Sequence, residues 1–413
     1  MKISQVRAIE ILDSRGKPTV RAFITLEDGS VHNASVPSGA STGKYEALEL
    51  RDGDEKRFQG QGVQSAVTHI NNDLSKLLIG KEVGELRQID QIMLDADGTE
   101  NKSKMGANAI LAVSLAVARA AACADKKPLW QFLHDYYFSK YEVGFPRLMV
   151  NVVNGGKHAQ WNFDIQEFMI VPKSNIPSES TRIAAEVFAQ LGKILKKRSL
   201  SILVGDEGGY SPSLASNNEV LDTIITAAQE LGYSNGKEYE FALDAAASEF
   251  FENDGYIFKK ENRTLSPEEL VAYYLEMQKK YGVYSFEDPF SEDDWKHFAQ
   301  LTAHSNGEYL VVGDDLFVTN PKRLTQGIEQ HAANAILVKV NQIGTLLETV
   351  EAIIMAREAG FKIVISHRSG ETEDSFIADL AYACGSDLIK TGSMSRSDRL
   401  SKYNRLLEIE AGL

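Results

Sequence analysis

The chain has 413 residues, a formal net charge of −14, 43% hydrophobic residues and 25% charged residues. The length predicts about two domains with a sizeable core, and the acidic charge without a basic stripe excludes nucleic acid as a favoured partner. Two cysteines, Cys123 and Cys384, lie in no metal-binding pattern, so we expect both to be reduced core residues of a cytoplasmic protein.

The first third of the chain has the pattern of an α+β unit. Three successive runs have strand composition, and Asp28-Gly29 is typical of a hairpin turn: 6–14, 18–26 and 30–37. Three helical patterns follow at 63–80, 86–100 and 106–124.

The stretch 106–124 is the most apolar part of the chain. Alanine dominates it, and Asn108, Ser114 and Arg119 interrupt it, so we expect a close-packed soluble helix rather than a membrane span. The first residues lack the apolar segment and cleavage site of a signal peptide, so none is expected.

The remainder predicts an α/β barrel. Residues 136–145 lack strong periodicity and are interpreted as a linker between an N-terminal α+β capping domain, 1–135, and a C-terminal domain, 146–413. Two strands lie at 146–156 and 166–172, and 202–209 is expected to end another strand. Helical and strand patterns alternate from about residue 182, which favours a parallel βα barrel.

Six strand-like runs each end in a titratable residue. Successive residues of this series lie roughly 23 to 43 positions apart, which brackets the ~31 residues of one βα unit: Asp244, Glu287, Asp314, Lys339, His367 and Lys390. Because strand ends of one polarity meet at one mouth of a barrel, we expect these side chains to face a single point. The three carboxylates suit Mg²⁺, although an alternative is that each acid caps the following helix.

Other segments carry further candidates. The loop 38–43, SGASTG, suits a lid that contacts metal or phosphate, or is a flexible surface turn. Residues 154–168 hold His158 and the pair Gln166-Glu167, and 204–209 places Asp206 and Glu207 before two glycines.

Two more predictions concern cationic residues. Lys339 lies between two valines, and burial together with nearby cations is expected to lower its pKa toward that of a general base. Arg368 and Ser369 suit a phosphate or carboxylate, while an ion pair to a neighbouring acid is the alternative for Arg368.

Together these motifs resemble the enolase family along essentially the whole chain. The motifs occur in the family's order, from Asp13–Gly16 to Lys402–Asn404: DSRG, SGASTG, GGKHA, QEFM, GDEGG, SFEDP, GDD, KVNQIGT, SHRSGE, IKTGS and KYN. The resemblance implies an N-terminal α+β domain followed by a modified TIM barrel.

The resemblance also implies an activity, the reversible dehydration of 2-phospho-D-glycerate to phosphoenolpyruvate in glycolysis. Lys339 would be the base and Glu207, helped by Glu167, the acid. Two Mg²⁺ ions per site would be bound by Asp244, Glu287 and Asp314 and, in the mobile loop, by Ser41. The other substrate contacts would be His158, Gln166, Glu167, His367, Arg368, Ser369 and Lys390.

The family further implies a cytoplasmic homo-oligomer, a dimer or octamer, with no nucleic-acid or membrane partner. Gln160–Phe163 departs from the smaller, glycine-containing loop usual in the family, and the chain ends without the terminal lysine linked to plasminogen binding in some members. Two alternatives stay open: a related enzyme acting on a non-phosphorylated carboxylate, and a catalytically silent scaffold.

Overall fold

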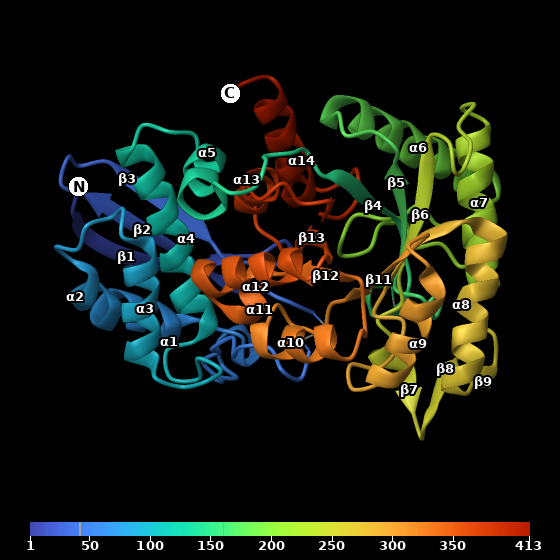
Figure 1. The fold of residues 1–413 in the computed structure, drawn as a ribbon, viewed down its shortest axis with the longest axis horizontal. Coiled ribbons are helices and arrows are strands. Elements are labelled where there is room, and N and C mark those ends of the chain that lie inside the picture. The colour runs from blue at the N-terminus through green and yellow to red at the C-terminus, as the bar shows by residue number, and fades with distance from the viewer. Residues whose placement is uncertain (41–42, 160) are drawn as a thin grey trace.

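The computed structural model describes residues 1–40, 43–159 and 161–413, without the side chain of His158. An N-terminal α+β part packs beside a larger closed barrel surrounded by helices (Figure 1). The predicted fold class is therefore confirmed, while residues 136–138 of the proposed linker belong to the π-helical turn His134–Phe138.

The N-terminal part is an antiparallel meander covered by helices. Strands β1 (Ile3–Leu12), β2 (Pro18–Leu26) and β3 (Val31–Ser35) pair in sequence order, as predicted. Its helices are α1 (Gln64–Thr68), α2 (Ser75–Leu78), α3 (Leu86–Asp97), α4 (Ala107–Ala124) and α5 (Leu129–Leu133).

Helix α4 is the core helix of this part and packs on β2 and β3. Among the described residues, it is long and apolar enough to cross a membrane, yet 83% of it is buried inside the protein. Cys384 is buried, but the expectation that Cys123 is also a core residue is wrong. Cys123 is exposed because the last turn of α4 emerges at the protein surface.

Eight strands close the barrel. They are β4 (Arg147–Asn154), β5 (Glu167–Pro172), β6 (Tyr239–Asp244), β10 (Val283–Glu287), β11 (Leu310–Gly313), β12 (Ala335–Val338), β13 (Lys362–Ser366) and β14 (Leu388–Lys390). The expectation of a fully parallel barrel is wrong for β5, which runs antiparallel to β4 and β6. The reason is the connection: among its described residues, the loop 155–166 holds one short 3₁₀ turn, Gly156–Ala159, and no crossover helix, so the chain reverses.

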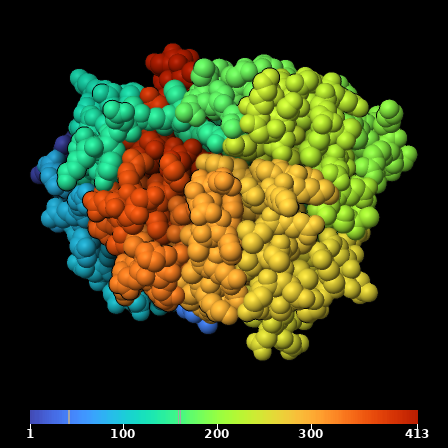
Figure 2. All heavy atoms as spheres, turned by 45° about the vertical axis from the view of Figure 1, so that its right-hand side comes forward, coloured from blue at the N-terminus to red at the C-terminus, as the bar shows by residue number. Residues whose placement is uncertain are grey.

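Helices surround these strands. They are α6 (Pro177–Lys197), α7 (Asn217–Gln229), α8 (Pro267–Tyr281), α9 (Trp295–Ser305), α10 (Pro321–Glu329), α11 (Val340–Ile343), α12 (Leu346–Glu358), α13 (Phe376–Ala383) and α14 (Ser397–Glu410). A small sheet of β7 (Phe251–Glu252), β8 (Gly255–Phe258) and β9 (Arg263–Leu265) protrudes at the lower edge (Figure 2).

Alternation along the barrel strands separates two cores. Ala335 and Leu337 of β12 point into the barrel, where they pack with Val312 and Val364, whereas Ile336 joins the larger core outside the strands. Both faces are apolar, which explains the nearly continuous hydrophobic runs in the sequence. The same alternation sets the direction of each residue at a strand end.

Candidate active site

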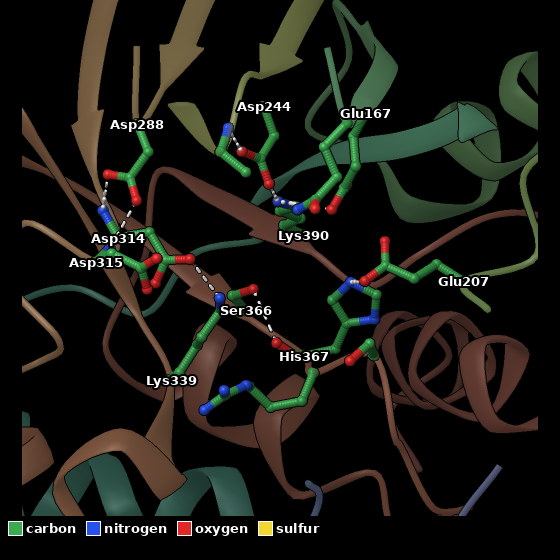
Figure 3. A pocket seen from close by; sticks show the side chains of 14 residues that line it. Glu167, Glu207, Asp244, Asp288, Asp314, Asp315, Lys339, Ser366, His367 and Lys390 are labelled. Carbon is green, nitrogen blue, oxygen red and sulfur yellow. Dashed lines mark hydrogen bonds and ion pairs between the residues drawn. The ribbon is translucent and has the colours of Figure 1, made fainter. Parts of the chain in front are cut away.

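A narrow polar cavity lies where the barrel strands end (Figure 3). Its lining contains ten of the sequence-predicted site residues: Gln166, Glu167, Glu207, Asp244, Asp314, Lys339, His367, Arg368, Ser369 and Lys390. Four residues that the sequence did not single out also line it: Ala246, Asp288, Asp315 and Ser366. The expectation that the strand-end series converges on one point agrees with this geometry.

The period of two along each strand directs these side chains inward. Leu337 points into the barrel and Lys339 follows two positions later; Leu388 precedes Lys390 in the same way. Strand β5 runs backwards, so its first residue, Glu167, lies at the mouth and pairs in register with Asp244 at the end of β6. Asp244 is in turn level with Glu287.

Three carboxylates surround one ammonium group. Lys390 Nζ lies 2.9 Å from Asp244 Oδ2, 2.8 Å from Glu287 Oε1 and 3.2 Å from Glu167 Oε1. Glu287 is fully buried behind the cavity wall. Burial raises the pKa of Glu287, and Asp244 adds to the effect. For Asp244, burial alone would raise the pKa, but Lys390 outweighs it and the pKa lies below its usual value.

Lys339 forms an ion pair with Asp314 at the opposite side of this cluster. Burial has the largest single effect and lowers the pKa of Lys339, and Arg368 and Lys390 lower it further, but the nearby carboxylates, led by Asp314 and aided by Glu287, raise it more in sum. The pKa therefore lies above its usual value, and the expectation of a lowered pKa is wrong for the chain in this state. The sequence pattern could not reveal that Asp314 contacts the lysine.

Glu207 reaches the cavity from a loop, not from a strand end as predicted. Residues 202–209 lie between α6 and α7, where Val204 makes an isolated bridge with Tyr210 and Leu203 is 76% exposed. An apolar run that faces solvent cannot be told from a buried strand by composition. Asn151 Nδ2 donates to Glu207 Oε2 at 3.0 Å, and His367 Nε2 lies 3.5 Å from Oε1.

Glu167 is a buried carboxyl group that shares the cavity with Glu207. Burial raises its pKa well above the usual value, and the charge of Glu207 raises it further. Two carboxyl groups that share one buried site do not both ionise readily. The pair Glu167 and Glu207 therefore has the chemistry of an acid.

Arg368 forms the ion pair that was its alternative interpretation. Its two terminal nitrogens lie 2.9 and 3.1 Å from the carboxylate oxygens of Glu46, in the N-terminal part, and Nη1 also donates to Asn341 at 2.9 Å. Ser369 Oγ accepts the backbone N–H of Ala40 at 2.7 Å. These contacts join the barrel mouth to Ala40, within the predicted lid 38–43, and to Glu46, just beyond it.

Two predicted site residues cannot be placed in full. Ser41 lies outside the described residues, and so does the side chain of His158, whose backbone belongs to the 3₁₀ turn Gly156–Ala159. Their assigned roles stay predictions.

The sequence interpretation predicted Asp314 but missed two acids that line the cavity beside it, Asp288 and Asp315. Asp288, Asp314 and Asp315 each have a carboxylate oxygen within 4.8 Å of the others. The oxygens of Asp288 accept the backbone N–H groups of Asp314 and Asp315 at 2.8 and 2.7 Å, so Asp288 holds the turn in place. The adjacent acidic residues in the motifs SFEDP and GDD could have pointed to Asp288 and Asp315.

The donor set fits a hard divalent cation. Asp244, Glu287 and Asp314 offer oxygens alone, which Mg²⁺ prefers. The two ammonium groups of Lys390 and Lys339 already lie against these carboxylates, so the cluster is built to hold positive charge. The alternative of helix caps is wrong for Asp244 and Glu287, because Ala246 and Asp294 are the N-cap residues of the helices that follow them.

Comparison with protein families agrees with both parts of the fold. The family described as "Enolase, N-terminal domain" matches residues 3–133, and "Enolase, C-terminal TIM barrel domain" matches residues 142–413. These matches cover nearly the whole chain and include every residue of the cavity. The chain therefore belongs to the enolase family, whose domains indicate a lyase-type enzyme.

Proposed function

We propose that this protein is a phosphopyruvate hydratase (EC 4.2.1.11), which dehydrates 2-phospho-D-glycerate reversibly to phosphoenolpyruvate in glycolysis and gluconeogenesis. One observation carries the proposal: a lysine and a pair of carboxyl groups face one cavity from opposite sides, with Lys339 on one side and Glu207 and Glu167 on the other (Figure 3). Loss of water across a carbon–carbon bond needs a base and an acid in this arrangement.

Lys339 is the group that takes the C2 proton. It must be neutral to do so, and its partner Asp314 holds it charged in the present state. Any cation that competes for Asp314 removes the contact that raises the pKa of Lys339. Asp314 thereby couples cation binding at the carboxylate cluster to the protonation state of Lys339.

Proton removal next to a carboxylate builds a second negative charge on that group. The ammonium of Lys390 lies on the cavity floor, where it opposes this charge. Two Mg²⁺ ions, one on Asp244, Glu287 and Asp314 and one completed by Ser41, would supply further positive charge to the substrate carboxylate and phosphate. Glu207, assisted by Glu167, then protonates the departing C3 hydroxyl.

The phosphate of the substrate is assigned to Arg368 and Ser369. Arg368 is fully charged and its planar fork matches phosphate oxygens, but it must exchange or share Glu46 to bind them. His158, Gln166 and His367 complete the proposed substrate contacts. Closure of the loop 38–43 over the mouth is expected to exclude water.

A homo-oligomer, a dimer or octamer, is also proposed. It is supported by the solvent-exposed apolar run Ile202, Leu203 and Val204, whose relative exposures are 47%, 76% and 40%. A cytoplasmic location is proposed because both cysteines are free thiols. Analytical ultracentrifugation checks the first of these proposals; a monomer at micromolar concentration contradicts it.

A coupled assay tests the activity. The protein with Mg²⁺ and 2-phosphoglycerate is expected to form phosphoenolpyruvate, and D-glycerate is expected to be inert because it cannot engage Arg368 and Ser369. Turnover of the non-phosphorylated acid instead favours the related-enzyme alternative. Absence of turnover with either substrate favours the scaffold.

A further inference from the structure

Arg399, in the first turn of α14, is a completely buried arginine that joins two loops of the active site. Its Nη1 lies 2.5 Å from His367 Nδ1 and donates to Arg368 O at 2.5 Å. Its Nη2 donates to Ser369 O at 2.6 Å and to Asp206 O at 3.1 Å. One guanidinium thus ties the loop that carries Glu207 to the loop that carries His367.

The contact with His367 dictates where the ring proton is. A guanidinium has N–H donors and no acceptor, and it stays protonated in proteins. Nδ1 of His367 must therefore accept, which requires a bare nitrogen at this position. The neutral ring then carries its proton on Nε2.

A charged imidazolium is excluded by the surroundings. Burial lowers the pKa of His367 well below its usual value; Glu207 opposes this shift, while Arg399, Lys390 and Lys402 reinforce it. A doubly protonated ring would also point an N–H of Nδ1 at the N–H of Arg399. The ring is thus a neutral donor through Nε2.

The Nε2 atom is buried, makes no hydrogen bond among the described residues and faces the cavity, 3.5 Å from Glu207 Oε1 (Figure 3). A buried donor without a partner costs free energy unless something occupies the space beside it. The donor is therefore available to an oxygen that arrives between His367 and Glu207. In the proposed reaction, that oxygen is the departing C3 hydroxyl.

We propose that Arg399 is a positioning residue for the dehydration: it fixes His367 as the Nε2–H tautomer and holds that N–H against Glu207 and the leaving oxygen. The role in catalysis rests on the proposed function, whereas the tautomer does not. In the opposite tautomer, the lone pair of Nε2 would face both the carboxylate and the hydroxyl oxygen. The lone pair would repel the negative charge on these oxygens, whereas the leaving hydroxyl needs a hydrogen-bond donor at this point.

The wild-type protein tests the tautomer directly. Protein labelled with ¹⁵N at histidine alone is examined by long-range ¹⁵N–¹H correlation NMR, and the His367→Asn variant identifies the His367 signals by their loss. We expect a protonated Nε2 and a bare Nδ1 across neutral pH. A protonated Nδ1, or an imidazolium at pH 7, overturns the proposal whether or not the protein turns over 2-phosphoglycerate.

Variants test the catalytic consequence. Lysine at position 399 keeps the charge but cannot reach all four acceptors, so Arg399→Lys is expected to lower kcat by roughly 10- to 100-fold. Arg399→Gln also allows the amide oxygen to accept from Nδ1, so the NMR signature should shift toward the Nδ1–H tautomer. Arg405→Lys is the matched control, because Arg405 lies on the same helix and pairs with Asp379 away from the cavity.

The outcomes separate the two proposals. If Arg399→Lys is folded and kcat stays within twofold, Arg399 only stabilises the fold and the inference fails. If wild-type protein has the Nε2–H tautomer but makes no phosphoenolpyruvate, the tautomer assignment stands and the proposed function fails. If no Arg399 variant folds, the wild-type NMR result decides the inference alone.

Discussion

Lys390 binds both carboxylate oxygens of Glu287, at 2.8 and 2.9 Å, in the centre of the cluster assigned to the metal. The same ammonium group lies 2.9 Å from Asp244. Since isolated buried carboxylates are costly, Lys390 holds the cluster together when no other cation is present.

Replacing Lys390 therefore has a predictable effect on stability. In chelator, Lys390→Met should lower the free energy of unfolding by about 3–5 kcal/mol, because buried carboxylates lose their partner. Saturating Mg²⁺ should raise the melting temperature of the variant more than that of the wild type. Lys362→Met, which removes an exposed ion pair to Asp387, should cost less than about 1 kcal/mol. Equal Mg²⁺ responses of Lys390→Met and wild type would falsify the cluster assignment.

Asp314→Asn should weaken the metal site, because it removes one of three anionic ligands. We expect the Mg²⁺ dissociation constant, measured by calorimetry, to rise by at least about tenfold. Asp293→Asn is the control, because Asp293 is a surface acid that lies close to Glu287 in the sequence. Unchanged Mg²⁺ binding by Asp314→Asn means that Asp314 is not a ligand.

Glu207→Gln should separate the two halves of the reaction. The amide cannot donate the acid's proton, so phosphoenolpyruvate formation should fall by roughly 10²- to 10⁴-fold. Exchange of the C2 proton with solvent should persist, because Lys339 lies across the cavity. If exchange is lost in parallel with dehydration, Glu207 is not specifically the acid.

Asp90 links the N-terminal part to the barrel and should make stability depend on pH. Its Oδ2 accepts the N–H of Leu347, and burial raises its pKa to about 7. The folded state thus binds this proton more tightly than the unfolded state, and the stabilisation is lost progressively as pH rises from the ordinary pKa of 3.8 to about 7.

Asp90→Asn is neutral at every pH and escapes this loss. Above pH 7 the variant should be more stable than wild type, by up to about 4 kcal/mol, whereas near pH 4 the two should converge. Urea unfolding at pH 5 and pH 8 measures the difference. A constant difference between the two pH values argues that Asp90 does not titrate in this range.

Much of the site was predictable because side chains alternate in direction along a strand, so the direction of a residue at a strand end follows from the sequence. Asp244, Lys339 and Lys390 follow apolar strands at positions that point inward, so one sequence period gives their direction. Asp288 and Arg399 were not predicted because their side chains hydrogen-bond to backbone atoms of segments that are distant in the sequence. The pKa of Lys339 was misjudged for a related reason: a contact across two strands decides it.

In the fold, too, some features were predictable from the local sequence and others were not. The meander and the alternation of strands and helices follow from local patterns, whereas the reversal of β5 depends on what its connecting loop lacks. The run Ile202–Val204 has strand composition but lies exposed, and in the described part of the chain it pairs only through an isolated bridge of Val204 with Tyr210. Tertiary surroundings decide such short segments.

The central claim is that Lys339 removes the C2 proton of 2-phosphoglycerate. Incubation in D₂O with Mg²⁺, followed by proton NMR of the recovered 2-phosphoglycerate, measures this step apart from dehydration. We expect wild type to replace the C2 proton by deuterium and Lys339→Ala to show none of this exchange over the same period. Exchange by folded Lys339→Ala at a rate near that of wild type would contradict the assignment of the base and the mechanism built on it.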